Sequence, residues 1–146
     1  VVGQWLQENF QDHGQKILVA AKGIEVQTGR FLNEIFSLHV DPSRLAYLSG
    51  PSFAAEVMKS LPTALVISSI NKEVAETFSH YFPSFIKTYS ADDIVGAEVC
   101  GAYKNVLAIA SGVCDGLELG NNARASLIAR GLVEMQRFSQ AFGAKK

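Results

Sequence analysis

The pattern of strands and helices that the sequence predicts changes near Asp92. Before this point, short apolar runs alternate with amphipathic helical segments, which is typical of an α/β layer around a largely parallel sheet. After it, the apolar residues follow a helical period and no further strand is expected. We therefore expect two partial domains, an α/β unit over residues 1–91 and a helical unit over residues 92–146.

The boundaries of the expected elements follow from apolar periodicity, turn residues and helix caps. Asn71 is expected to cap the helix that follows it. Asp92 or Asp93 is expected to cap the first long helix, and Asn121 or Asn122 the second. The chain is expected to leave the second long helix at Gly143. Strands are expected at residues 17–21, 45–48, 63–68 and 85–89. Helices are expected at residues 4–12, 29–38, 72–82, 92–113 and 121–142, with a short one from residue 53.

Lys104 stands in a helical stretch that carries almost no charge. Between Ile94 and Cys114 the only charged residues are Glu98 and Lys104, and the face of the helix that Lys104 shares is small and apolar, as at Gly101. Such neighbours would keep water from the ammonium group and lower its pKa toward the range in which a lysine exchanges protons with a substrate oxygen. Lys104 is therefore a candidate general acid/base. The alternative is a lysine whose stem crosses an apolar surface while its head reaches water.

Two further candidate sites come directly after predicted strands. Lys22 and Gly23 follow the strand at 17–21, and the turn at 49–52 follows the strand at 45–48. Ligands of open α/β sheets collect at the carboxyl ends of strands, and a turn that leads into a helix presents N–H groups to anions. A solvated Lys-Gly turn and an ordinary capped turn are the alternatives.

Three segments together resemble the NAD(P)-dependent glycerol-3-phosphate dehydrogenase family. They are Ala21-Lys22-Gly23, the stretch LSGPSFAAEV at 48–57, and the stretch 101–122, in which Gly-Ala-Tyr-Lys-Asn is followed by Asp-Gly and Gly-Asn-Asn. Tyr103 departs from the family pattern, which has an aliphatic residue there, so packing or substrate fit beside the lysine is expected to differ. The resemblance implies the C-terminal part of a Rossmann-like nucleotide-binding domain, followed by the first long helices of an all-α substrate domain.

The resemblance also implies a reaction and roles for individual residues. The reaction is reversible hydride transfer between NAD(P)H and dihydroxyacetone phosphate, which gives sn-glycerol 3-phosphate, and the cofactor is NAD or NADP. Lys104 is implied as the general acid/base, and Asn105 as a residue that binds and orients the substrate beside it. Further substrate-binding positions are implied at Lys22, Gly50 and Ser52, and cofactor-binding positions at Lys22 and Ala54.

The same resemblance implies that the chain is an internal piece of such an enzyme. The family begins with a strand and a Gly-rich turn that holds the dinucleotide pyrophosphate, whereas no G-x-G-x-x-G occurs here. The family's Arg-Asn pair for the substrate phosphate would follow Lys146, so the isolated piece is expected to be inactive. Two alternatives stay open: a β-hydroxyacid or 6-phosphogluconate type of dehydrogenase, and a non-catalytic interaction fragment.

Composition and charge give no indication of a nucleic-acid, membrane or metal partner. The net charge of −1 offers no basic surface for nucleic acid, and no apolar run approaches the roughly 20 residues that span a bilayer. The three histidines are scattered, so no metal site is expected. The expected partner is a small-molecule substrate, and the oligomeric state is left open, with a homodimer as one candidate.

The two cysteines bear on the compartment. Cys100 and Cys114 are expected on one helix, about 21 Å apart, which is too far for a disulfide between them. Free thiols suit a reducing compartment. The expected location is the cytoplasm, with a plastid or another reducing organelle as the alternative.

Overall fold

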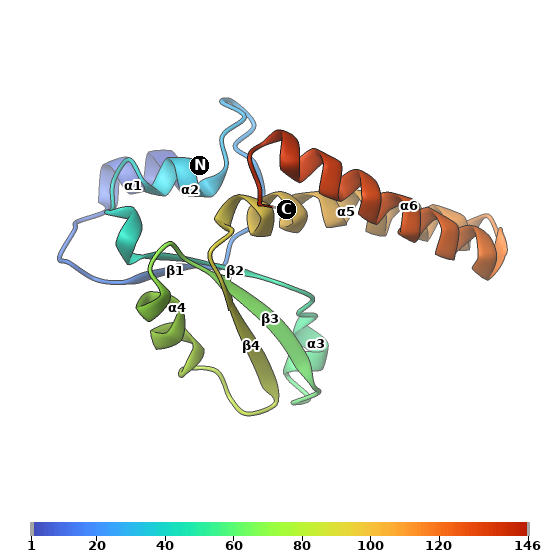
Figure 1. Ribbon diagram of the computed structural model, residues 1–146, viewed down its shortest axis with the longest axis horizontal. Helices are drawn as coiled ribbons and strands as arrows, with labels where there is room; N and C mark the ends of the chain where they lie inside the picture. Colours follow the sequence, from blue (N-terminus) through green and yellow to red (C-terminus); the bar gives the residue numbers. More distant parts are fainter. Residues whose placement is uncertain (1, 146) are drawn as a thin grey trace.

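The computed structural model describes residues 2–145 and has the expected α/β architecture (Figure 1). Its strands are β1 (Ile17–Val19), β2 (Leu45–Ser49), β3 (Thr63–Ser68) and β4 (Ile86–Ala91). Its helices are α1 (Val2–Asn9), α2 (Leu32–Phe36), α3 (Ala54–Val57), α4 (Lys72–Ser79), α5 (Ile94–Gly116) and α6 (Gly120–Ala141), and a 3₁₀ turn, η1 (Pro42–Arg44), precedes β2. The change from alternating elements to helices alone therefore occurs where the sequence predicts it.

The four strands form one mixed sheet in the order β1-β2-β3-β4. β1 pairs with β2, and β3 with β4, in parallel, whereas β2 and β3 are antiparallel. The expectation of a largely parallel sheet thus misses the reversal at the centre. The reason lies in the connection between the two strands, where α3 has only four residues and is too short to carry the chain back along the sheet as a crossover helix would.

Both faces of the sheet are covered, because β2 is apolar at successive positions that point to opposite sides. Leu45 and Tyr47 belong to one buried cluster, together with residues of α1, α2 and β1. Ala46 belongs to a second cluster on the other face, with Ile67 of β3 and Val74 of α4. The carboxyl end of β2 therefore emerges between two packed layers.

Helix caps were predicted with mixed success. The Asn71 side chain accepts a hydrogen bond from the backbone N–H of Glu73, and the Asp93 side chain accepts one from Gly96, so both predicted caps are confirmed. The prediction for α6 is wrong, since the helix begins at Gly120, and Leu119, the residue before it, makes no side-chain cap. Positive φ angles at Glu118 and Gly120 turn the chain before the two asparagines, which then lie in the first helical turn.

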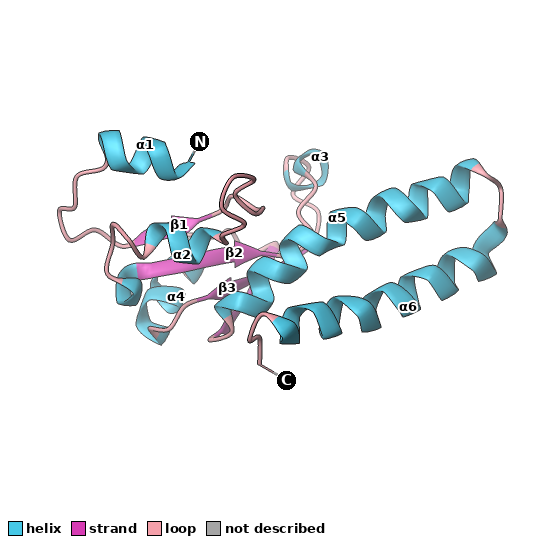
Figure 2. Ribbon diagram, turned by 90° about the horizontal axis from the view of Figure 1, so that it is seen from above, coloured by secondary structure: helices cyan, strands magenta, loops and turns pink. Residues whose placement is uncertain are grey.

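The two long helices form an antiparallel hairpin that projects beyond the sheet (Figures 1 and 2). The first turns of α5 contact β2, β3 and α2, where Val99 is fully buried, and the rest of α5 packs along α6. The two partial domains at 1–91 and 92–146 stay a prediction, and α5 itself packs against both parts. None of the helices between residues 2 and 145 is long and apolar enough to cross a membrane.

Two helix glycines provide a matched test of the contact between α5 and α6. A Cβ atom at Gly131 of α6 would overlap the Leu107 side chain of α5, whereas a Cβ at Gly112 of α5 meets no atom of the described residues within 4 Å. We expect Gly131→Ala to lower the free energy of unfolding by up to about 2 kcal/mol, because overpacking outweighs the gain in helix propensity. Gly112→Ala should instead raise it by roughly 0.5–1 kcal/mol.

Urea unfolding of both variants measures the difference. Equal stabilisation by the two substitutions would contradict the close approach of the helices at Gly131.

Candidate active site

The two candidate lysines approach each other at the edge of the sheet where β1 and β2 end. Because these strands are parallel, the loops that follow them leave the same edge, and Lys22 and Gly50 stand in these loops. The Lys22 ammonium group donates a hydrogen bond to the Gly50 carbonyl oxygen at 3.1 Å. Lys104 comes from α5, which crosses the same edge.

Gly101 is the position on α5 that lets the Lys22 stem lie against the helix. A Cβ at Gly101 would lie 3.7 Å from both Cγ and Cδ of Lys22 and 3.4 Å from Oγ of Ser49. The Ser49 hydroxyl donates to the carbonyl oxygen of Ala97 at 3.1 Å, so the end of β2 is bonded to α5 one turn before Gly101. A Cβ atom at these distances would be in ordinary van der Waals contact, whereas a side chain that extends beyond Cβ would compete with the Lys22 stem for the same space.

Lys22 and Lys104 are close enough to repel each other. The pKa of Lys22 is lowered, first because part of the side chain is buried and second because of the nearby positive charge of Lys104. Within residues 2–145, neither lysine forms a salt bridge with an acidic side chain. The space beside them therefore carries positive charge that an anionic ligand could neutralise.

Gly50 is required by its backbone conformation and by its packing. Its φ angle is +132°, and a Cβ there would lie 2.8 Å from the carbonyl oxygen of Ala64. The glycine thus allows the loop after β2 to turn tightly against β3. Its carbonyl oxygen is thereby held where Lys22 binds it.

The other predicted site residues lie around this centre without direct contacts that assign them a role. Asn105 is exposed and follows Lys104 on α5, while Ser52 and Ala54 are exposed at the start of α3. Their roles stay predictions. The three arginines of α6 are held in surface ion pairs, Arg124 with Asp115 and both Arg130 and Arg137 with Glu134.

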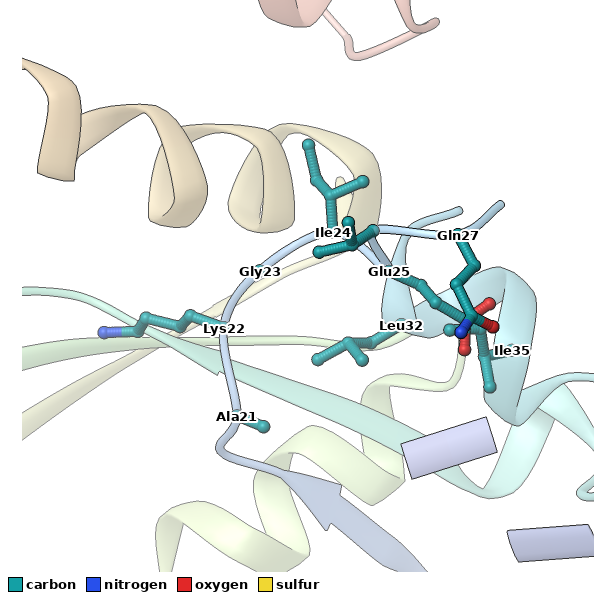
Figure 3. Close-up of a pocket in the computed structure, with 9 residues that line it drawn as sticks. Ala21, Lys22, Gly23, Ile24, Glu25, Gln27, Leu32 and Ile35 are labelled. Atoms are coloured by element: carbon teal, nitrogen blue, oxygen red, sulfur yellow. The ribbon is translucent and has the colours of Figure 1, made fainter. Parts of the chain in front are cut away.

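A pocket of about 300 Å³ opens beside Lys22, over the loop that connects β1 to α2 (Figure 3). Its wall is mainly apolar and includes Ile24, Leu32 and Ile35, with Glu25 and Gln27 at one end. The side chain of Lys22 extends away from that end. The pocket and the two lysines thus form adjoining parts of one surface.

A half-buried acidic residue beside this surface was missed by the sequence reasoning. Glu98 of α5 shares the wall of a second, smaller pocket with Lys22 and Tyr47, and its carboxylate accepts a hydrogen bond from the backbone N–H of Asn33 at 3.0 Å. Burial raises the pKa of Glu98 to about 7, and the nearby charge of Glu34 acts in the same direction. The Tyr47 hydroxyl and the Asn33 side-chain oxygen are buried without a partner within the described residues.

The charge repulsion between the two lysines gives a testable prediction. Replacing Lys104 by methionine should raise the pKa of Lys22, because the effects of Lys104 that lower it are removed and only burial is left. The pKa of the Lys22 ammonium group can be followed by NMR titration of the carbon next to it. The control is Lys87→Met, on the exposed part of β4, which should leave the pKa of Lys22 unchanged. An unchanged pKa of Lys22 in Lys104→Met would contradict the proximity of the two ammonium groups.

Comparison with known proteins identifies relatives for almost the whole chain. The family model described as the NAD-dependent glycerol-3-phosphate dehydrogenase N-terminus matches residues 1–75, and the one described as the C-terminus of the same enzyme matches residues 93–146. Glycerol-3-phosphate dehydrogenase [NAD(P)+] of Sulfurimonas denitrificans is 65% identical over 144 residues, which are 99% of this chain and 49% of the relative. The protein of the same name from Campylobacter jejuni subsp. doylei is 65% identical over 142 residues, 97% of this chain and 48% of the relative.

Solved structures agree with these relatives. The crystal structure of glycerol-3-phosphate dehydrogenase from Coxiella burnetii superimposes with a TM-score of 0.89 at 39% identity, over 99% of this chain and 44% of that one. The structure of DsGPDH of Dunaliella salina gives a TM-score of 0.84 at 26% identity, over 94% of this chain and 24% of that one. The chain spans about half the length of the curated relatives it matches. Since both family models match and together cover most of its residues, the chain belongs to the NAD-dependent glycerol-3-phosphate dehydrogenase family.

Proposed function

We propose that this chain supplies the proton-transfer and substrate-binding centre of an NAD(P)-dependent glycerol-3-phosphate dehydrogenase. The observation that carries the proposal is the pair Lys22 and Lys104 at the edge of the sheet where β1 and β2 end. These two ammonium groups repel each other and have no acidic partner among residues 2–145. Such a pair suits an anionic, oxygen-rich substrate. Dihydroxyacetone phosphate and sn-glycerol 3-phosphate, which the enzyme interconverts, have this chemistry.

The residues present fit the reactive end of a nicotinamide cofactor and a small substrate. Glycines 23 and 50, in the loops after β1 and β2, border the site, so a ligand can come close to the backbone there. In the proposed site, Lys22 and Ala54 contact the cofactor, while Lys22, Gly50, Ser52 and Asn105 bind the substrate. NAD or NADP, when bound, supplies or accepts the hydride.

Lys104 acts as the general acid/base of the proposed reaction. In the reducing direction its ammonium group gives a proton to the oxygen of the substrate ketone as that oxygen gains negative charge, and in the oxidising direction the neutral amine removes the hydroxyl proton. The positive charge of Lys22 stabilises the same developing oxyanion or the substrate phosphate. The Gly50 carbonyl oxygen orients Lys22 by accepting a hydrogen bond from one of its three N–H groups.

We also propose that the enzyme is cytoplasmic. The similar proteins from Sulfurimonas and Campylobacter are bacterial, and both cysteines of this chain are free, as suits a reducing compartment. The homodimer stays a prediction.

The function is tested in a full-length chimaera. Residues 1–146 replace the matching segment of the Sulfurimonas denitrificans relative, and NADH or NADPH oxidation is measured with dihydroxyacetone phosphate. We expect activity that Lys104→Ala lowers by about 100-fold or more, because a positioned acid/base group usually contributes 10²–10⁴. The matched control Lys87→Ala, on β4, should keep the parental rate.

Each possible failure has a distinct meaning. A folded chimaera that binds NADH but does not reduce dihydroxyacetone phosphate would overturn the substrate. Full activity of Lys104→Ala would overturn the role of that lysine. The isolated chain is expected to be inactive, so it serves as the negative arm.

Lys22 should affect substrate binding more than the chemical step. Removing a charge-assisted hydrogen bond generally costs about 1.5–3 kcal/mol, so Lys22→Ala should lower kcat/KM for dihydroxyacetone phosphate roughly 10- to 100-fold, mainly through KM. Steady-state kinetics of the chimaera measure this split. An unchanged KM would show that Lys22 does not contact the substrate.

A further inference from the structure

We propose that Glu98 is a positioning residue that bonds the catalytic helix α5 to helix α2 and thereby holds Lys104 in place relative to Lys22. This inference rests on the proposed function for its catalytic consequence, whereas the contact itself belongs to the fold. Glu98 is not proposed to contact the substrate. It acts through the helices that it joins.

The start of α2 has a donor that its own sequence cannot satisfy. The residue before the helix is Phe31, whose side chain has no acceptor, although the first N–H groups of a helix need partners from outside it. Glu34 of α2 accepts the N–H of Phe31 at 2.8 Å. The N–H of Asn33 is instead accepted by both carboxylate oxygens of Glu98, at 3.0 and 3.3 Å, from 65 residues further along the chain.

This cap connects the two segments that carry the lysines. The loop with Lys22 leads directly into α2, and Lys104 follows Glu98 by six residues, about 9 Å along the axis of α5. A bond between Asn33 and Glu98 therefore fixes the distance between the segments close to both ammonium groups. Ser49, bonded to the Ala97 carbonyl oxygen, holds the same part of α5 from β2.

A row of aromatic rings links the same segments by a second route. Phe31 packs edge-on against Phe142 with ring centres 5.3 Å apart, Phe142 packs against Phe138 at 4.9 Å, and Phe138 packs against Tyr103 at 5.5 Å. Tyr103 directly precedes Lys104. The residue before α2 and the neighbour of the proposed catalytic lysine are thus connected through the last turns of α6.

The surroundings of Glu98 make its charge state sensitive to pH near neutrality. The titratable groups that face it are Glu34 on α2, the Tyr47 phenol on β2 and Lys22 in the loop after β1. Burial raises the pKa of Glu98 to about 7, from 4.5 for an ordinary glutamate, so the group changes its charge within the physiological range. The ionised form is the stronger acceptor for the Asn33 N–H.

The effect of this pKa on stability has a defined sign. The folded protein holds the Glu98 proton up to about pH 7, whereas the unfolded chain releases it near 4.5. The contribution of Glu98 to stability is therefore full below the unfolded value, falls as pH rises between the two values, and is constant above about 7. Glu98→Gln cannot ionise but keeps an acceptor oxygen for the Asn33 N–H.

The test compares Glu98→Gln and Glu98→Ala in the full-length chimaera, with Glu34→Gln as the control. Glu98→Gln should keep kcat within about twofold at pH 8 and remove the inflection near pH 7 from its pH profile. Glu98→Ala should lower kcat roughly tenfold or more, because small displacements of catalytic groups are costly. Glu34→Gln should retain the inflection and move it to lower pH, because the charge of Glu34 is one of the causes that raise the pKa of Glu98.

Measurements that need no turnover separate this inference from the proposed function. Amide hydrogen exchange at Asn33 should be at least about fivefold faster in Glu98→Ala than in Glu98→Gln, since the loss of a helix cap weakens the first turn by about 1 kcal/mol. The decrease in stability between pH 4.5 and 7 should be smaller in Glu98→Gln than in the parent. If Glu98→Ala does not fold, the pH profile and stability of Glu98→Gln decide. Parental exchange, stability and pH profile in both variants would overturn the inference, whether or not dihydroxyacetone phosphate is the substrate.

Discussion

The geometry of the site depends on the packing of the first turns of α5 against the carboxyl end of β2. Val99 is completely buried there, and the Ser49 hydroxyl binds the helix backbone at Ala97. The absence of a side chain at Gly101 leaves room for the stem of Lys22 along the helix. Because Lys104 lies one turn beyond Gly101, its position follows from this contact. A shift of the helix on the sheet would separate the two ammonium groups.

The lysine pair keeps an unfavourable interaction in the folded protein. Two positive charges at close range destabilise each other, and the lowered pKa of Lys22 records part of that repulsion. Acidic side chains could have neutralised them, but the charged residue that packs beneath this region, Glu98, is directed to the N–H of Asn33. An anionic ligand between the lysines would relieve the repulsion. The positive charges of the two lysines are thus placed to bind a negative charge on the ligand.

Local signals in the sequence predicted most of the fold, and the failures have physical causes. All four strands were predicted with ends within two residues of the observed ones, and the caps at Asn71 and Asp93 were also found, because these features follow from short-range chemistry. The antiparallel pairing of β2 and β3 depends on the connection through the short helix α3, whose direction periodicity does not report. The start of α6 at Gly120 depends on backbone angles in the turn before it. The proximity of Lys22 and Lys104, 82 residues apart, depends on α5 crossing the edge of the sheet at which β1 ends, which local signals in the sequence do not report.

Glu98 shows what the sequence argument overlooked and why it matters. The reasoning that singled out Lys104 as one of two charges in an apolar helical stretch applies equally to Glu98. Six residues correspond to about 600° of helical rotation, so the two side chains leave α5 on different faces. One face carries Glu98 toward α2 and β2, and the other carries Lys104 toward the loop of Lys22. A single helix therefore bears both the proposed proton carrier and the group that anchors it, and the isolated charges of an apolar helix are best considered as a pair.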